Sequence, residues 1–209
     1  MKPFGSDNIL LYDNHLLVLD KPVDIATQPD LEELGKAWVK KKFNKPGNVF
    51  LEPIHRLDKP VAGVVLFART SKALSRLQEQ MREREMEKIY IGWVEGSPKE
   101  QQGILKHYLL HGSFRAEISP EGKESILEYE VLKKEKDRSL LRIRLQTGRY
   151  HQIRAQMSAI GCPILGDAKY GSRRGWEKGI ALYASELAFK HPVSQEEIRV
   201  KSQLSIIDR

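Results

Sequence analysis

Short apolar runs joined by turn residues make up most of this chain, and this pattern limits the folds that it can adopt. Residues 9–12 and 16–19 flank Asp13-Asn14-His15, which predicts a hairpin because Asp and Asn favour tight turns. Residues 126–132 and 139–146 predict a second hairpin. Expected strands outnumber expected helices, and most of them connect through hairpins. We therefore expect an α+β fold with a mixed, largely antiparallel β-sheet core in two lobes and flanking helices.

Three segments carry helix signals. Asp30 and Glu33 have the spacing of a capping box, which predicts a helix that begins at this point. Thr70 or Ser71 is expected to cap a second helix, because both hydroxyls can accept a hydrogen bond from the first turn. Residues 150–160 predict a third, short helix.

The chain has 209 residues, 40% of them hydrophobic and 30% charged, which suits one domain over residues 1–209 or one domain of two lobes. The net charge of +7 favours a polyanionic partner, nucleic acid first. The single cysteine, Cys162, excludes an internal disulfide and a multi-cysteine metal site. The chain shows no signal-peptide core, and no run approaches the roughly 18 apolar residues of a membrane span. We therefore expect a soluble, cytoplasmic protein.

One carboxylate, Asp58, lies between two cations in the stretch 54–63. The apolar run 64–67 that follows is too short and too β-branched for a helix, so it predicts a buried strand with Asp58 on the loop before it. Arg56 and Lys59 would keep Asp58 ionised at neutral pH, as a nucleophile or base toward an anionic polymer. The alternative is a surface aspartate that pairs with Lys59 or Arg56.

Several reaction classes lack the residues that they need. His55, Asp58 and His151 match no common zinc-ligand spacing. The chain lacks a serine nucleophile elbow and the glycine patterns of Walker and Rossmann sites. Glycosidase chemistry needs a second acid beside Asp58, and neither Glu52 nor Asp167 is a compelling candidate. Metal, nucleotide-cofactor and two-carboxylate chemistry are therefore without support.

What remains is one carboxylate, basic side chains and an aromatic ring on a strand. In the expected strand 88–96, Tyr90 lies beside Gly92, which would leave open space over the ring. Arg142 and Arg144 alternate outward on their strand and could form a basic strip. Bases stack on tyrosine, arginine binds phosphate, and chemistry on a base in folded RNA requires taking that base out of its stack. These residues therefore suit an enzyme that modifies RNA bases.

Four segments, in order, resemble the RluA family of pseudouridine synthases. His55-Arg56-Leu57-Asp58, followed by Gly63 and an apolar run, resembles the catalytic motif of that family. The other three are the tyrosine strand 88–96, the block 148–171 that contains His151-Gln152-Ile153-Arg154, and the closing strand 182–192. Lys21-Pro22 resembles the family's N-terminal segment, and the resemblance spans about residues 7–192. Each segment alone is a weak signal, whereas four in order are specific.

This resemblance implies that the chain isomerises specific uridines in ribosomal or transfer RNA to pseudouridine. It implies a pseudouridine synthase fold with a central RNA-binding cleft. The base is detached at N1, rotated and rejoined through C5, and no metal or organic cofactor takes part. We also expect a monomer with no membrane partner. The catalytic domain is expected to stand alone, without an N-terminal S4 domain, so that RNA binding falls to the catalytic body.

The resemblance assigns roles to five residues. Asp58 would be the essential carboxylate, which attacks C6 of the base, attacks C1′ or abstracts the 2′ proton. Arg154 would pair with Asp58, or would be an ordinary surface arginine of its helix. Tyr90 would stack under the uracil and could assist removal of the C5 proton, or would be an ordinary strand tyrosine with a solvated hydroxyl. Arg56 would enter the RNA where the flipped nucleotide left, or would contact phosphate. Leu182 would pack against the bound base, or would be an ordinary core leucine.

The chain departs from the family pattern at three places. Val61-Ala62 stands where the family usually has Thr-Ser, Tyr150 replaces a threonine, and Tyr183 replaces a histidine. None of these changes touches the Asp, Tyr and Arg set. Three more polar residues are expected to be loop scaffolding, because buried polar groups need partners: His55, His151 and Gln152.

Two other functions remain open at this point. A non-catalytic RNA-binding or ribosome-assembly protein on the same fold would suit the net charge and would not require Asp58. An RNA-directed nuclease or glycosidase is the weaker alternative, and strand scission or free uracil among the products would support it.

Overall fold

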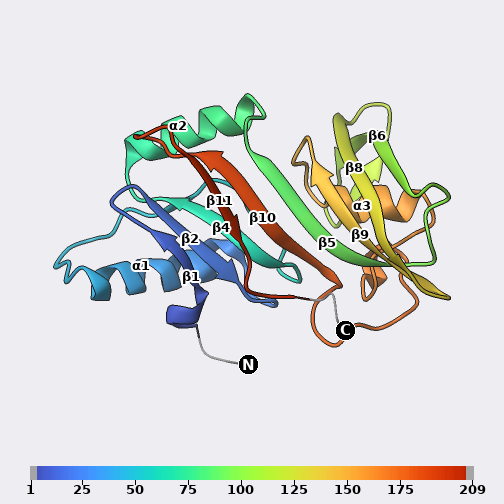
Figure 1. The fold of residues 1–209 in the computed structure, drawn as a ribbon, viewed down its shortest axis with the longest axis horizontal. Coiled ribbons are helices and arrows are strands. Elements are labelled where there is room, and N and C mark those ends of the chain that lie inside the picture. Colours follow the sequence, from blue (N-terminus) through green and yellow to red (C-terminus); the bar gives the residue numbers. More distant parts are fainter. Residues whose placement is uncertain (1–3, 206–209) are drawn as a thin grey trace. The chain divides into compact units, whose positions relative to one another are not determined.

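The computed structural model describes residues 4–205, which divide into two compact units (Figure 1). Residues 4–86 and 184–204 form unit 1, and residues 87–183 form unit 2. The prediction of one domain over residues 1–209 includes both chain ends, which lie outside the described residues, and it stays a prediction. No helix within residues 4–205 is long and apolar enough to span a membrane.

Unit 1 contains a sheet with the strand order β1-β2-β4-β10, in which β3 also pairs with β4 and β11 with β10. The pairs β1–β2, β2–β4 and β10–β11 are antiparallel. The elements are the 3-10 helix η1 (Ser6–Asn8), β1 (Ile9–Tyr12), β2 (Leu16–Lys21), the π-helical turn η2 (Thr27–Leu31), α1 (Glu32–Lys42), β3 (Glu52–Pro53), β4 (Ala62–Ala68), α2 (Ser71–Arg82), β10 (Leu182–Lys190, in unit 1 from residue 184) and β11 (Glu197–Lys201).

The predicted first hairpin is confirmed, and its turn has a specific cause. One carboxylate oxygen of Asp13, Oδ1, accepts hydrogen bonds from the backbone N–H groups of His15 (2.6 Å) and Leu16 (2.8 Å). The predicted cap of α2 is also confirmed, since Thr70 Oγ1 accepts from Ala73 N at 3.2 Å. Local side-chain acceptors therefore set both features, which is why the sequence alone could indicate them.

The predicted capping box at Asp30 and Glu33 is wrong. Asp30 Oδ2 accepts from the backbone N–H of Ala26 at 2.9 Å, so it stabilises the preceding turn instead of the helix start. Helix α1 begins two residues later, at Glu32, and the N-cap residue before it, Leu31, makes no side-chain capping bond. The π-helical turn takes up the residues that the capping box would have used.

The sheet of unit 1 is buried on both faces, which explains why every residue of β2 is buried. On one face, Leu16 and Val18 join the cluster that contains Leu77 of α2 and Phe189 of β10. On the other face α1 packs closely, because a Cβ at Gly35 would lie 3.3–3.4 Å from side-chain atoms of Leu19 and Leu17. Helices α1 and α2 thus cover opposite faces of these strands.

Unit 2 contains an antiparallel sheet with the strand order β5-β9-β8-β6-β7. The second predicted hairpin is confirmed as β8 and β9. Helix α3 contacts β6 and β7. The elements are β5 (Glu87–Glu95), β6 (Gln102–His111), β7 (Ala116–Ile118), β8 (Lys123–Lys134), β9 (Arg138–Leu145), α3 (Gln152–Ala159) and the 3-10 helix η3 (Ala168–Tyr170). The expected α+β class with a largely antiparallel sheet is confirmed.

Strand β4 begins at a point where only glycine fits. Gly63 has a φ of +117°, a region that L side chains rarely adopt. A Cβ added at Gly63 would lie 2.2 Å from the carbonyl oxygen of Ala184 on β10, so the two backbones could not stay this close. Gly63 follows Asp58 by five residues and therefore fixes where the loop of Asp58 joins the sheet.

We predict that Gly63→Ala lowers the free energy of unfolding by at least about 3 kcal/mol, because backbone strain and the clash with Ala184 act together. Gly47→Ala is the matched control in the same unit: no atom lies within 4 Å of its added Cβ, and the expected change is below about 0.5 kcal/mol. Chemical denaturation of both variants checks this, and equal stabilities would contradict the close approach of β4 and β10.

Candidate active site

Asp58 lies on the loop between β3 and β4, directly before the buried strand, as the sequence predicts. Its side chain is partly buried, and its backbone carbonyl accepts a hydrogen bond from Val61 N at 3.0 Å, which closes a turn. Arg56 and Lys59, the two cations beside it in the sequence, are exposed. A partly buried carboxylate at the end of a rigid strand is a common way to carry a reactive group.

The residues on both sides of Asp58 are tied to the segment that follows β2. Thr27 Oγ1 accepts from Leu57 N at 3.0 Å and donates to Leu57 O at 3.1 Å, and both residues are buried. Lys59 O accepts from Asp24 N at 2.9 Å. Asp58 is therefore held from the residue before it and from the residue after it, and its backbone has little freedom to move.

A buried lysine completes this attachment. Lys21, at the end of β2, has no solvent exposure, and its Nζ donates to Ile25 O (2.7 Å), Pro22 O (3.1 Å) and Lys59 O (3.2 Å). Burial lowers the pKa of Lys21 from its ordinary 10.5 to about 8, and the negative charge of Asp58 is the largest influence that opposes this shift. The ammonium is thus mostly protonated at neutral pH and acts on the Asp58 carboxylate.

The direction of this pKa shift determines how the contribution of Lys21 to stability changes with pH. Because the folded-state pKa of Lys21 lies below 10.5, the unfolded chain binds the extra proton between about pH 8 and 10.5. The contribution of Lys21 to stability therefore rises with pH across that window. The family resemblance includes Lys21-Pro22 but assigns Lys21 no role, and in the strand itself the only signal is the polar pair Asp20-Lys21 at its end.

In unit 2, Arg154 on α3 forms a buried ion pair with Asp167. Its Nε donates to Oδ2 at 2.6 Å and its Nη2 to Oδ1 at 2.9 Å, and the two side chains are 6% and 2% exposed. The guanidinium also lies over the ring of Tyr170, 5.0 Å from the centroid. This bidentate pair removes Asp167 as a candidate second acid. The predicted pairing of Arg154 with Asp58 stays a prediction.

The expected scaffolding residues have the partners that this role requires. His151 Nδ1 lies 2.9 Å from the hydroxyl of Tyr170, which also accepts from Ala116 N at 2.7 Å. Gln152 Oε1 accepts from Thr147 Oγ1 at 2.8 Å and from Arg149 N at 2.9 Å. In unit 1, His55 Nε2 accepts from Leu66 N at 3.3 Å. These bonds fix the loops that hold the site residues.

Tyr90 and Leu182 lie on the same side of β5, since Tyr90 and Gly92 are two residues apart on one strand. The predicted open space at Gly92 is wrong: a Cβ there would meet Leu182 Cδ1 at 3.1 Å and Ala181 O at 3.2 Å. Trp93 N donates to Ala181 O at 2.9 Å, so this segment packs directly against β5. Leu182 therefore fills the space that the glycine leaves beside Tyr90.

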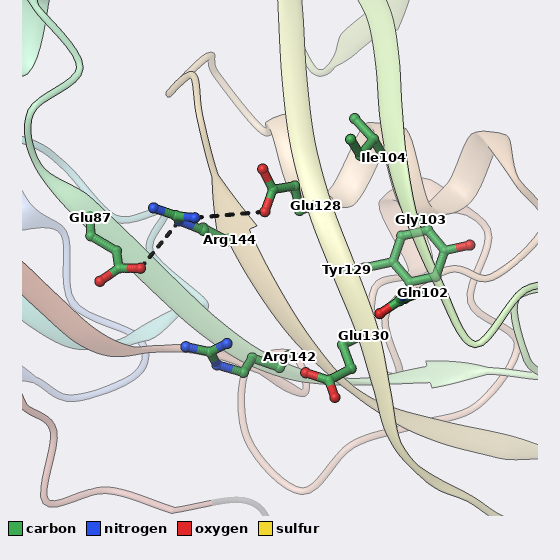
Figure 2. Close-up of a pocket in the computed structure, with 9 residues that line it drawn as sticks. All are labelled: Glu87, Gln102, Gly103, Ile104, Glu128, Tyr129, Glu130, Arg142 and Arg144. Atoms are coloured by element: carbon green, nitrogen blue, oxygen red, sulfur yellow. Dashed lines mark ion pairs between the residues drawn. The ribbon is translucent and has the colours of Figure 1, made fainter.

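A hollow of about 590 Å³ lies on unit 2 and contains none of the five predicted site residues (Figure 2). Arg142 and Arg144 point outward here, as predicted, but the prediction that they form a basic strip is wrong. Figure 2 shows Arg144 between Glu87 (3.2 Å) and Glu128 (3.9 Å), and Glu130 adds a third carboxylate. With three acids against two cations, this surface does not favour a polyanion. Among residues 4–205, no group of three or more His, Cys, Asp or Glu side chains could hold a metal ion.

Comparisons with known proteins agree on one family. The sequence model described as RNA pseudouridylate synthase matches residues 15–159. "Dual-specificity RNA pseudouridine synthase RluA" of Pasteurella multocida is 36% identical over 201 residues, which cover 90% of this chain and 89% of that protein. "Ribosomal large subunit pseudouridine synthase C" of Escherichia coli is 34% identical over 213 residues, which cover 95% of this chain and 67% of that protein.

A solved structure shows the same fold. "Human RNA Pseudouridylate Synthase Domain Containing 4" matches 95% of this chain and 89% of its own with a TM-score of 0.82, at 21% identity. "Human RNA Pseudouridylate Synthase Domain Containing 1" matches with a TM-score of 0.76 at 24% identity, over 98% of this chain and 86% of its own. At these identities the likeness supports the fold alone.

We predict that Asp58→Asn lowers the pKa of Lys21 further below its value of about 8, because the largest opposing charge is removed. NMR titration of the chain with 13C-labelled lysine measures this pKa. Asp30→Asn is the matched control, since Asp30 has the smallest effect of the three carboxylates that act on Lys21. Equal shifts in the two variants would show that Asp58 is not the principal partner of the buried ammonium.

We also predict that Asp167→Asn lowers the free energy of unfolding by about 3 kcal/mol, because a buried guanidinium loses its bidentate carboxylate. Asp137→Asn, which removes the carboxylate from the exposed pair with Arg174, is expected to leave the denaturation midpoint unchanged. If the two variants unfold at the same denaturant concentration, the Arg154–Asp167 pair does not stabilise unit 2.

Proposed function

Since this chain belongs to the RNA pseudouridylate synthase family, and is thus an isomerase that acts on RNA, we propose that Asp58 is its essential carboxylate. The observation that carries this assignment is the loop geometry. Asp58 is the carboxylate whose two neighbours in the chain are both tied to buried groups, and it lies where the motif of the family places the acid. A fixed carboxylate loses less entropy on reaching the transition state.

The reaction moves the uracil base without adding or removing atoms overall. The N1–C1′ bond breaks, a C5–C1′ bond forms, C5 loses a proton and N1 gains one. Asp58 starts this sequence by attack on C6, by attack on C1′ or by removal of the 2′ proton. In each route the carboxylate acts through its negative charge, and the same charge is the largest influence that opposes the lowering of the Lys21 pKa. The balance requires no oxidant, reductant or cofactor.

Arg154 is the proposed partner that orients Asp58. Asp167 engages the Nε and Nη2 atoms of its guanidinium, which fixes the plane of the group. An arginine held in this way would approach Asp58 in a set direction when the two are paired. This role is electrostatic and positional, because guanidinium does not give up its proton at neutral pH.

Tyr90 and Leu182 are the proposed contacts to the base. Tyr90 supplies the ring on which uracil stacks, and its hydroxyl could assist removal of the C5 proton. Leu182, which packs against β5 at Gly92, would border the same base. Arg56 is exposed on the loop of Asp58 and would fill the space of the flipped nucleotide or bind phosphate.

The RNA substrate is proposed from the names of the relatives. One relative is named for the large ribosomal subunit, so ribosomal RNA is the first candidate. Another is called dual-specific, and transfer RNA, the other substrate class that the family resemblance implies, is the second candidate. A catalytic domain over residues 1–209 that acts as a cytoplasmic monomer is part of the same proposal.

We predict that Asp58→Asn lowers pseudouridine formation by at least roughly 1000-fold while the dissociation constant for RNA changes little, because the carboxylate acts on the reacting nucleotide alone. Release of tritium from RNA made with 5-tritiated uridine measures turnover. Asp24→Asn removes the carboxylate with the second-largest effect on Lys21, and it is expected to keep activity within about twofold.

Unchanged turnover in Asp58→Asn would rule out this mechanism. If neither wild-type chain nor variant forms pseudouridine in RNA isolated from cells that lack the gene, the non-catalytic RNA-binding function would stand instead.

A further inference from the structure

The C-terminal end of α1 and the loop after it carry an unusual concentration of positive charge. Residues 34–51 contain five lysines and no Asp or Glu, in a chain whose whole net charge is +7. Lys40, Lys41, Lys42 and Lys45 are all exposed. We call these four lysines, together with Tyr12, Trp38 and Phe43, the α1 patch. Every member belongs to unit 1.

Nothing in the described part of the chain neutralises these four lysines with a carboxylate. Lys36, one turn earlier, behaves differently, since it pairs with Glu32 at 2.5 Å and Glu33 at 3.0 Å. Lysines at a helix C-terminus also stabilise the helix dipole, which is the ordinary explanation for one such residue. Three consecutive lysines point about 100° apart, so they cannot all approach the same carbonyl groups. Stabilisation of the helix dipole therefore does not account for all of these lysines, and the remaining positive charge is available to a ligand.

Aromatic rings lie among these cations and are held in place. Phe43 is 37% exposed, and its ring contacts Tyr12 (6.2 Å between centroids) and Trp38 (6.4 Å) edge to face. The guanidinium of the buried Arg69 lies 4.3 Å from the Phe43 centroid, and Arg69 also donates to the carbonyl of Asp13. The ring is thus ordered before any ligand binds, which lowers the entropy cost of binding to it.

We propose that the α1 patch is a second RNA-binding surface, on which the four lysines contact phosphates and Phe43 stacks an unpaired base. Cations interleaved with ordered aromatic rings are the features that bind single-stranded nucleic acid. An anionic membrane is less suitable, because a helix that lies in a membrane surface turns its apolar face outward. In α1 that face is buried: Val39 is fully covered, as is Leu31 directly before the helix. The proposal rests on the proposed function only for the choice of RNA.

The fold of unit 1 places the patch within reach of an RNA whose target nucleotide lies at Asp58. The segment before α1 holds the Asp58 loop through Thr27 and Leu57. Helix α1 then runs for 11 residues, which is about 16 Å, to the patch. At 3.4 Å per nucleotide along a stacked strand, that length corresponds to roughly five nucleotides. The patch therefore contacts nucleotides several positions away from the reacting uridine and adds affinity without taking part in the chemistry.

The first test removes the charges. The variant K40Q/K41Q/K42Q/K45Q of the full chain is titrated with a fluorescein-labelled 20-nucleotide oligouridylate at several salt concentrations. The logarithm of the association constant falls linearly as the logarithm of the salt concentration rises. Loss of four phosphate contacts makes this slope less steep by about 3. The matched control K106Q/K133Q/K190Q/K201Q removes the same net charge from lysines that pair with glutamates, and its slope is expected to change by less than 1. Equal slopes in the two variants would overturn the proposal.

The second test removes the ring. Phe43→Leu keeps apolar bulk against Trp38 and Tyr12, so the variant should unfold at nearly the wild-type midpoint, while the Kd for the oligouridylate rises about tenfold. A 2-aminopurine base in the oligonucleotide should be quenched by wild type and less by the variant. No change in Kd and in quenching would remove Phe43 from the proposal.

Two further outcomes distinguish the alternatives. If the lysine variant loses binding to vesicles of phosphatidylcholine with phosphatidylserine and keeps its salt slope for the oligouridylate, the patch is a membrane site and the proposal fails. These measurements use binding alone. A failure of Asp58→Asn to abolish pseudouridine formation would thus overturn the proposed function and leave the result at the α1 patch standing.

Discussion

The Lys21 ammonium, buried and hydrogen-bonded to three backbone carbonyls, determines where the loop of Asp58 lies. Burial of an unpaired charge is costly, and the lowered pKa of Lys21 reports that cost. Three carbonyl acceptors and the negative charge of Asp58 offset it. Because one of these carbonyls belongs to Lys59, the group that compensates the ammonium is also the group that holds the residue after Asp58. The position of the proposed reactive carboxylate therefore depends on the same buried ammonium that its negative charge helps to stabilise.

Unit 2 uses the same arrangement for its own charged residue. Arg154 is buried and has a bidentate partner in Asp167, and the loop of Asp167 is fixed through the Tyr170 hydroxyl, His151 and the backbone of Ala116. Each unit thus prepares its proposed site residues with internal bonds before RNA binds. Such preparation is the principal way that a protein without a cofactor stabilises charge in a transition state.

Local patterns were predictable from the sequence, and interactions between distant residues were not. The Asp13 turn, the Thr70 cap and the strand after Asp58 depend on neighbours within a few residues, and all three are confirmed. The start of α1 was mispredicted because the Asp30 carboxylate accepts a hydrogen bond from the preceding turn, at Ala26 N, instead of from the first turn of the helix. The basic strip at Arg142 was wrong because the glutamates that neutralise it come from other strands.

The same reason explains the functional residues that sequence patterns missed. Thr27 and Lys21 bind the loop of Asp58 from about 30 and 38 residues away in the chain, a pairing that local sequence patterns do not reveal. Gly92 looked like open space because glycine has no side chain, yet Leu182 comes from 90 residues further along and fills it. The family resemblance proposes Asp58, Tyr90 and Arg154 as site residues, and the structure supplies the contacts that hold Arg154 and the loop of Asp58.

The central claim is that Asp58, held by Lys21 and aimed by Arg154, reacts with a uridine. An experimental structure of the chain bound to an RNA that contains its target uridine tests this most directly. Our account predicts the Asp58 carboxylate in contact with the target nucleoside, Arg154 at ion-pair distance from Asp58, and the Tyr90 ring against the uracil. A target nucleotide bound away from Asp58, or an Asp58 distant from both Arg154 and Tyr90, would contradict it.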